Sequence, residues 1–179
     1  EVESGRCLQV FEGHTSNVTD AAWGTDQRHI LSTAVDQTVR LWDVESGRCV
    51  RVLKGHTGFI ISMVWSADQR RVLSGHDNET VQLQDVESGR CLRVLEGHTS
   101  YIKSVAWSAD QRWAISGGGD GTVRLWDVET GRCVRVLRGH TATVIGVAWG
   151  AEPHRAFSAD QSGDTRVWDL SGDASESLG

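Results

Sequence analysis

The stretch 101–108, YIKSVAWS, alternates between two sets of side chains, as a strand with two different faces requires. Polar or glycine-rich turns separate it from three further expected strands, over 113–117, 122–128 and 133–137. The strands are short and evenly spaced, and the turns between them leave no room for helices. The pattern therefore predicts an all-β array.

The same pattern returns along the chain with a period of 42 residues. Each repeat opens on a Gly-His pair, at residues 13–14, 55–56, 97–98 and 139–140. A Trp-Asp pair ends the third strand at 42–43, 126–127 and 168–169, whereas the second repeat has Gln84 before Asp85. A period of about 40–45 residues with these two signatures is typical of propeller blades, each a four-stranded sheet.

On these residues the chain resembles the WD-repeat (WD40) β-propeller family over all but its last nine or so residues. The resemblance implies an all-β fold of four-stranded antiparallel blades, four per chain, within residues 1–170. The expected repeats are 13–54, 55–96, 97–138 and 139–170. Residues 171–179 are expected to form a flexible polar tail.

The two ends of the array differ from the repeats between them. The segment 7–11, CLQVF, is expected to be an outermost strand with no inner strands before it. At the other end, 165–170 (TRVWDL) is expected to be a third strand with no fourth after it. Propellers of the family usually close with the first strand, so we expect 7–11 to complete the last blade, in cis or in trans.

Four blades would each have to fill about 90° of a circle, against about 45–51° in rings of seven or eight. Blade faces shaped for the smaller angle would leave gaps at the larger one. We therefore expect two chains to pair as a homodimer, exchanging N-terminal strands to form one eight-bladed ring. A closed four-bladed monomer and a fragment of a longer repeat chain are the alternatives.

The formal net charge is −6, which argues against nucleic-acid and membrane partners, because both surfaces attract clustered Lys and Arg. The sequence shows no apolar run long enough to span a membrane and no signal peptide before the first repeat. A cytoplasmic location is expected.

The four cysteines, Cys7, Cys49, Cys91 and Cys133, share one register of the repeat. Equivalent positions on successive blades are too far apart for a disulfide, and no CxxC pair is present to hold zinc. We expect four small buried side chains, no metal site and no cofactor.

Repeat one contains a Ser, a His and an Asp, as a hydrolase triad does. In the WD-repeat family such residues form a hydrogen-bonded tetrad with the Trp, and repetition at equivalent positions indicates a scaffold, so no catalytic residue is expected. The residues assigned to these tetrads are His14, Ser32, Asp36, Trp42, His56, Ser74, His98, Ser116, Asp120, Trp126, His140, Ser158 and Trp168.

Two repeats depart from the tetrad. The second has Asn78 and Gln84 in place of Asp and Trp. The fourth has Ser162 at the register of the Asp, with Asp160 and Asp164 two residues to either side. Two further histidines, His76 and His154, are expected to be solvated loop residues.

Variation between the repeats concentrates just after the Gly-His-Thr run and just before the third strand. Two strands separate these positions, so they fall at the same end of the blade, where partners dock in the family. The residues assigned to this face are Asn17, Thr19, Val35, Phe59, Ile61, Asp77, Tyr101, Lys103, Gly119, Thr143, Ile145 and Gln161. Phe59, Ile61 and Tyr101 are the strongest candidates, because aromatic anchors often dominate interface energies. Unconstrained surface variation is the alternative.

A constant frame with variable loop positions is typical of a binding surface on a rigid scaffold. The sequence therefore predicts a non-enzymatic scaffold that binds a protein or peptide around the central channel. One alternative is a structural, self-assembling half propeller, engineered or cut from a longer repeat protein, with no ligand. Another is a site for a small molecule or glycan at the channel mouth.

Overall fold

The computed structural model describes residues 5–150, 152 and 154–172, and its regular elements are all β-strands. The first repeat holds β1 (Val18–Trp23), β2 (His29–Ala34), β3 (Val39–Asp43) and β4 (Cys49–Leu53). The second holds β5 (Ile60–Trp65), β6 (Arg71–His76), β7 (Val81–Asp85) and β8 (Cys91–Leu95). The third holds β9 (Ile102–Trp107), β10 (Trp113–Gly118), β11 (Val123–Asp127) and β12 (Cys133–Leu137). The fourth holds β13 (Val144–Trp149), β14 (Arg155–Asp160) and β15 (Thr165–Asp169).

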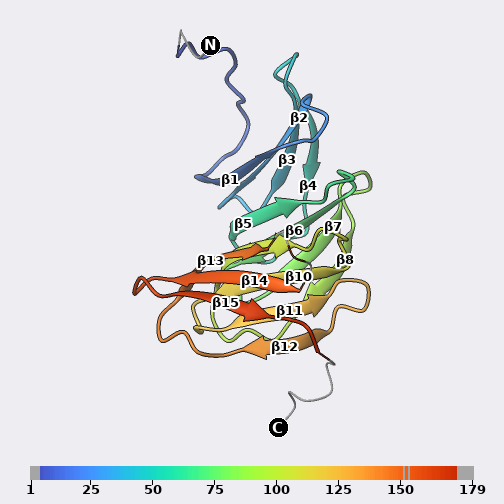
Figure 1. The fold of residues 1–179 in the computed structure, drawn as a ribbon. Coiled ribbons are helices and arrows are strands. Elements are labelled where there is room, and N and C mark those ends of the chain that lie inside the picture. The colour runs from blue at the N-terminus through green and yellow to red at the C-terminus, as the bar shows by residue number, and fades with distance from the viewer. Residues whose placement is uncertain (1–4, 151, 153, 173–179) are drawn as a thin grey trace.

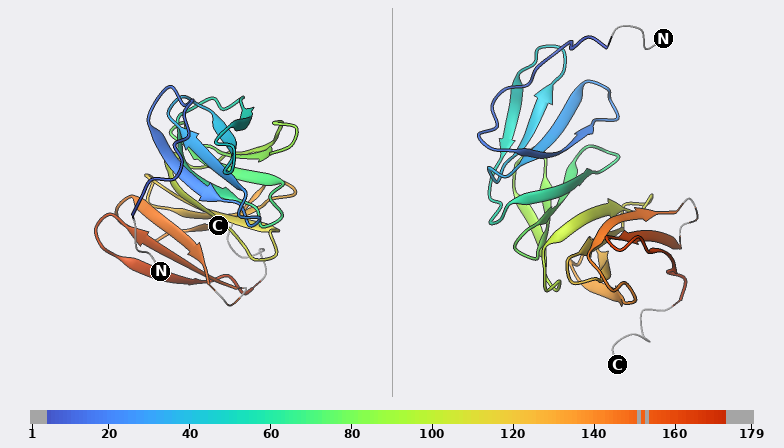
Figure 2. Two further views of the ribbon diagram at one scale, coloured as in Figure 1. Left: turned by 90° about the horizontal axis from the view of Figure 1, so that it is seen from above. Right: turned by 90° about the vertical axis from the view of Figure 1, so that its left-hand side faces the viewer.

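The strands of each repeat form one antiparallel sheet, in chain order from the inner to the outer strand. We call these sheets blades 1 to 4; the first three have four strands and blade 4 has three. Strand β5 packs against β1 and β2, β9 against β5 and β6, and β13 against β9 and β10. The blades therefore follow one another along an arc, which is open between blade 1 and blade 4 (Figures 1 and 2). The predicted all-β blade array is confirmed.

The turn between the first two strands of a blade is built by an Asp-Gln pair. Gln27, Gln69 and Gln111 have φ of 56°, 60° and 57°, the left-handed conformation that such a turn needs. The preceding Asp stabilises the turn because its carboxylate accepts a backbone N–H two residues later, as Asp68 Oδ1 does from Arg70 at 3.0 Å. This local chemistry recurs in blades 1, 2 and 3 and fixes where the second strand starts.

The apolar core lies in the joints between neighbouring blades. Between blades 1 and 2, Leu31 and Leu53 share one cluster with Ile60, and all three are 0% exposed. Between blades 2 and 3, Leu73 meets Ile102 in a second cluster, and a third cluster joins blades 3 and 4. Burial of each such side chain stabilises the fold by about 1.5–3 kcal/mol. The joints therefore hold the array together, and each blade depends on its neighbours.

Two expectations about the outer strands need correction or remain open. The segment 7–11 forms no strand within this single chain, and β15 pairs only with β14 among the described residues. Completion of the last blade thus stays a prediction, and most of the expected tail, 173–179, lies outside the described residues.

The expected burial of the cysteines is wrong: Cys7 and Cys91 are exposed. Their register falls at the start of the outermost strand, where Cys49 and Cys133 are only partly buried.

Candidate binding face

A chain of hydrogen bonds crosses the interior of blade 1. Trp42 Nε1 donates to Ser32 Oγ at 2.8 Å, and that hydroxyl lies 2.7 Å from His14 Nε2. His14 Nδ1 lies 2.9 Å from Asp36 Oδ2. Each group can donate to the next if the histidine is neutral with its proton on Nδ1. The network ties the loop before β1 to β2 and β3, as the family resemblance implies.

Blade 3 contains the same network. His98 Nδ1 lies 2.8 Å from Asp120 Oδ2, and His98 Nε2 lies 2.8 Å from Ser116 Oγ, which accepts from Trp126 Nε1 at 2.8 Å. Recurrence of the geometry in a second blade supports a structural role, because a catalytic site is normally built once.

Blade 4 builds the network with a different acid. His140 lies 2.7 Å from Ser158 Oγ and 2.9 Å from Asp160 Oδ2, and Trp168 Nε1 donates to Ser158 Oγ at 2.7 Å. Ser162, which stands at the register of the acid, instead donates to Asp160 Oδ1 at 2.7 Å. Asp160, two residues earlier on β14, therefore supplies the carboxylate that sequence register alone did not assign.

The acids of these networks are held ionised. Burial acts to raise the pKa of Asp36, but hydrogen bonds from Thr38, Thr15 and His14 outweigh it and lower the pKa to about 2. A hydrogen bond from Ser162, with others from His140 and backbone N–H groups, lowers the pKa of Asp160 to about 2 despite burial. In Asp120 burial again opposes the hydrogen bonds, which still hold the pKa far below its usual range.

The serines do not resemble nucleophiles. Ser32, Ser116 and Ser158 are 7%, 0% and 0% exposed, and each hydroxyl already accepts a hydrogen bond from a tryptophan. A substrate would have to displace that indole to reach the oxygen. The Ser-His-Asp sets therefore act as cross-links inside the blades.

Blade 2 differs from the other three. His56 Nδ1 lies 2.9 Å from His76 Nε2, and Ser74 Oγ lies 3.4 Å from the same His76 nitrogen. His76 is 0% exposed on β6, so its expected placement in a solvated loop is wrong. Gln84, at the register of the Trp, donates to the carbonyl of Lys54 at 2.8 Å. Burial lowers the pKa of both His56 and His76 to about 4, and the neighbouring ring adds to the shift of His56.

The two variable positions of each blade lie side by side, joined by one backbone hydrogen bond. The residue before the third strand donates its N–H to the carbonyl of the residue after the Gly-His-Thr run. The pairs and N–O distances are Val35 to Asn17 (2.9 Å), Asp77 to Phe59 (3.1 Å), Gly119 to Tyr101 (2.9 Å) and Gln161 to Thr143 (2.9 Å). We call the surface formed by these eight residues the loop face. It runs along one side of the arc, across all four blades.

Large apolar side chains are exposed on the loop face. Phe59 is 45% exposed and Tyr101 is 39% exposed, on neighbouring blades. The Phe59 backbone is fixed by a 2.7 Å bond from its N–H to Asp77 Oδ1, and Tyr101 Oη lies 3.4 Å from Thr143 Oγ1 in blade 4. The first contact fixes the backbone that carries the Phe59 ring and the second contacts the Tyr101 hydroxyl, and both rings stay exposed.

The remaining predicted positions lie two residues further into the inner strands, and their side chains differ in solvent exposure. Lys103 is exposed and Ile145 is 45% exposed, whereas Ile61 is half-buried. Thr19 donates from Oγ1 to the carbonyl of Ile60 in blade 2 at 2.8 Å. Thr19 therefore contributes to a blade joint, although its side chain stays partly open to solvent.

Neither a metal centre nor a membrane span is found in the part of the chain that the structure describes. No group of three or more His, Cys, Asp and Glu side chains there could hold a metal ion. No helix of those residues is long and apolar enough to cross a membrane.

Comparison with known proteins places the repeats. The family model described as WD domain, G-beta repeat matches residues 5–43, 47–85, 89–127 and 131–169. The chain is 43% identical over 44 residues to nuclear distribution protein PAC1 of Arthroderma otae and, equally, of Trichophyton verrucosum. Those alignments cover 25% of this chain and 10% of the relatives. A solved structure described as that of U3-55K matches with a TM-score of 0.83 at 27% identity, over 90% of this chain and 51% of that one.

Proposed function

The chain belongs to the WD40 (WD domain, G-beta repeat) family, and on that premise we propose that it is a non-enzymatic scaffold that binds a protein or peptide through its loop face. The observation that carries the proposal is the row of four backbone-paired loop positions with Phe59 and Tyr101 exposed on adjacent blades. Fixed backbone with varied side chains is the arrangement that recognition surfaces share.

The anchors are preorganised, which favours affinity because little freedom is lost on binding. Asp77 holds the backbone of Phe59 through two hydrogen bonds. The Phe59 N–H donates to Asp77 Oδ1, and the Asp77 N–H donates to the Phe59 carbonyl. Gly119 leaves room for the Tyr101 ring, because an added Cβ at Gly119 would lie 2.9 Å from the Cε1 of Tyr101. A partner that offers apolar side chains would cover both rings at once.

The absence of enzymatic activity is part of this proposal and is supported by the buried, indole-bound serines. The cytoplasmic location expected from the sequence is also part of it. Four unpaired thiols, two of them exposed, suit a reducing compartment better than an oxidising one.

A displayed library of random peptides provides the test. Peptides selected on the wild-type chain should lose binding by at least tenfold on the F59S/Y101S variant. The matched control is V50S/V94S, which removes side chains that are 54% and 45% exposed on the outer strands. Equal thermal unfolding midpoints would show that both variants remain folded. Peptides that bind F59S/Y101S as tightly as wild type would overturn the proposed site.

A further inference from the structure

Blade 4 exposes an apolar face whose equivalent is buried in the other blades. In each blade, one side chain at the centre of the second strand points toward the next blade. In blades 1 to 3 this residue is 0% exposed (Leu31, Leu73 and Ile115), whereas in blade 4 it is Phe157, which is 41% exposed. On the neighbouring strand Val167 is 66% exposed, whereas Leu83 and Leu125 at the same register are 3% and 6% exposed. Blade 4 thus presents the surface that packs against a following blade.

Blade 1 exposes the opposite face. Val18 is 56% exposed, and the residues at its register, Ile60, Ile102 and Val144, are all 0% exposed. In blade 3, Trp107 Nε1 donates to the carbonyl of Val64 in blade 2 at 3.3 Å, and the Arg71 guanidinium lies 5.2 Å from the same ring. Trp23 is the equivalent tryptophan and is 57% exposed, because no other blade packs against this side of blade 1 among the described residues.

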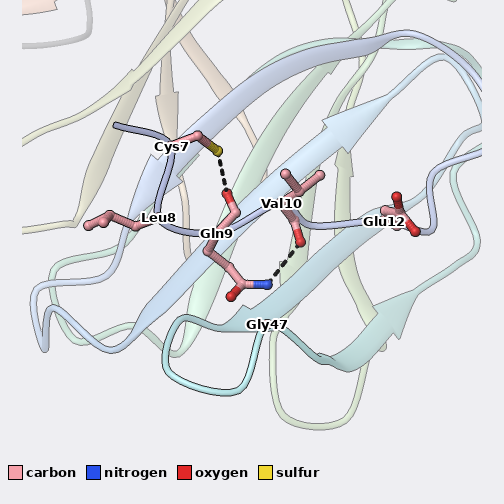
Figure 3. Close-up of a pocket in the computed structure, with 6 residues that line it drawn as sticks. All are labelled: Cys7, Leu8, Gln9, Val10, Glu12 and Gly47. Carbon is pink, nitrogen blue, oxygen red and sulfur yellow. Dashed lines mark hydrogen bonds between the residues drawn. The ribbon is translucent and has the colours of Figure 1, made fainter. Parts of the chain in front are cut away.

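The N-terminal segment occupies the place of an outer strand from a preceding blade. The Phe11 ring lies 5.7 Å from the Trp42 ring of blade 1. The residues at the same two registers, Leu95 of β8 in blade 2 and Trp126 in blade 3, share a core cluster. Gln9 lies against the turn at Gly47, lining a pocket of about 440 Å³ (Figure 3).

Blades 2 and 3 show the same contact between an outer strand and the turn of the next blade. Arg93 of β8 lies 3.5 Å from where a Cβ on Gly131 would be, and these two residues stand at the registers of Gln9 and Gly47. The segment 7–11 therefore sits on blade 1 as β8 sits on blade 3, although no inner strands accompany it in the described part of the chain.

Among the described residues, one end of the arc thus holds an outer segment without inner strands, and the other end holds a blade without a fourth strand. We propose that two copies of this chain close into one eight-bladed ring, in which the segment 7–11 of each copy becomes the fourth strand of the other copy's blade 4. The two ends lie at opposite tips of the arc, which disfavours closure within one chain (Figure 2). The arc superimposes on about half of a larger solved chain with a TM-score of 0.83, so its curvature is that of a segment of a larger structure.

The registers within the chain specify the contacts of the new joint. Arg40 pairs with Val52 across β3 and β4, so Arg166 should pair with Val10 of the second copy. Trp23 should stack on Arg155 of the second copy, as Trp107 does on Arg71.

Side-chain volumes also match across the new joint. Leu31 shares a joint with Met63, Leu73 with Val105 and Ile115 with Val147. The new joint would oppose Phe157 with Ala21. The large Phe157 side chain therefore meets the small Ala21 side chain, which keeps the packed volume of the joint nearly constant.

Light scattering over a hundredfold dilution tests the stoichiometry. We expect a steady mass of twice the 19.6 kDa chain, and a mass reduced to one chain in the F157E variant. The matched control V94E alters a side chain that is 45% exposed on an outer strand and should leave the mass unchanged. A steady single-chain mass for the wild type would overturn the proposal. A mass that grows with concentration beyond two chains would also overturn it, because it would indicate open filaments.

Cysteine cross-linking tests the strand exchange separately from the effect of F157E on folding. The four native cysteines are replaced by serine, and V10C and R166C are then introduced on separate chains. Refolding the two chains together under oxidising conditions should give a covalent dimer on a non-reducing gel, because only exchange between copies brings the thiols together. A mixture of V94C and R166C chains is the control and should stay uncrosslinked. If the V10C and R166C mixture gives no more dimer than this control, strand exchange is refuted.

Discussion

Nδ1 of His56 lies 2.9 Å from Nε2 of His76 in the interior of blade 2, and the ring centroids are 5.1 Å apart. Nδ1 of His76 lies 3.2 Å from the carbonyl of Thr80, so it carries the proton and leaves Nε2 to accept from His56. Both rings are therefore neutral in this arrangement. Protonation of either ring would place a charge in a buried site beside a second imidazole.

This pair predicts that stability falls as the pH falls from about 6.5 to about 4. Burial lowers the pKa of both histidines to about 4 in the folded chain, against 6.5 when exposed. Between those values the unfolded chain binds more protons, so acid favours unfolding. Below pH 4 a second loss follows down to about pH 2, because the carboxylate of Asp36 must be protonated.

Urea midpoints measured from pH 7.5 to 4.5 check the first loss. The control variant H154N removes an exposed histidine and should keep the wild-type profile. A wild-type midpoint that stays constant down to pH 4.5 would contradict the assignment to the buried pair.

Restoring the tetrad should stabilise blade 2. His56 Nε2 and Gln84 Oε1 are buried without a hydrogen-bond partner, which costs about 1–3 kcal/mol for each such group. The triple variant H76G/N78D/Q84W installs the residues that blade 3 has at Gly118, Asp120 and Trp126. We expect the free energy of unfolding to rise by about 1–3 kcal/mol and the stability loss between pH 6.5 and 4 to disappear. A less stable triple variant would mean that the blade has repacked around Gln84.

Most of the fold could be predicted from the repeat itself. The period of 42 residues superimposes four copies of each turn, so a turn signal such as Asp-Gln is read several times. The expected strand over 133–137 has the bounds of β12, and that over 101–108 differs from β9 by one residue at each end. Each blade repeats the same local physics, so local patterns determined the strands.

The register of the repeat does not predict a contact that a side chain makes from another position in the blade. Asp160 and His76 stand at the same register, where blades 1 and 3 have Ala34 and Gly118. A small residue there leaves room for an acid two residues further on, and a large polar residue fills that room itself. The sequence contained the signal, because both residues replace small ones. Their burial, however, depends on the three-dimensional space beside the histidine.

Ser116 should contribute more to stability than Ser74, although both are 0% exposed at the same register. In S116A the buried Trp126 Nε1 and His98 Nε2 each lose their partner, which predicts a loss of about 1–3 kcal/mol. In S74A only the 3.4 Å contact with His76 is lost, so a change below about 1 kcal/mol is expected. Urea unfolding of the two variants measures the difference, and equal losses would show that the tetrad adds nothing in blade 3.

The joint between blades 2 and 3 should resist any added volume at Gly75. A Cβ at this buried residue would lie 2.6 Å from Cγ2 and 2.9 Å from Cβ of Ile102, closer than packed carbons approach. G75A should therefore force the blades apart and cost about 1–3 kcal/mol of stability. Gly146 is the control, because no atom lies within 4 Å of its added Cβ and its φ is not positive. G146A should leave the thermal midpoint within a degree or two of wild type, whereas G75A should lower it by several degrees. If G75A and G146A unfolded at the same temperature, the joint would have to be looser than the packing of Ile102 indicates.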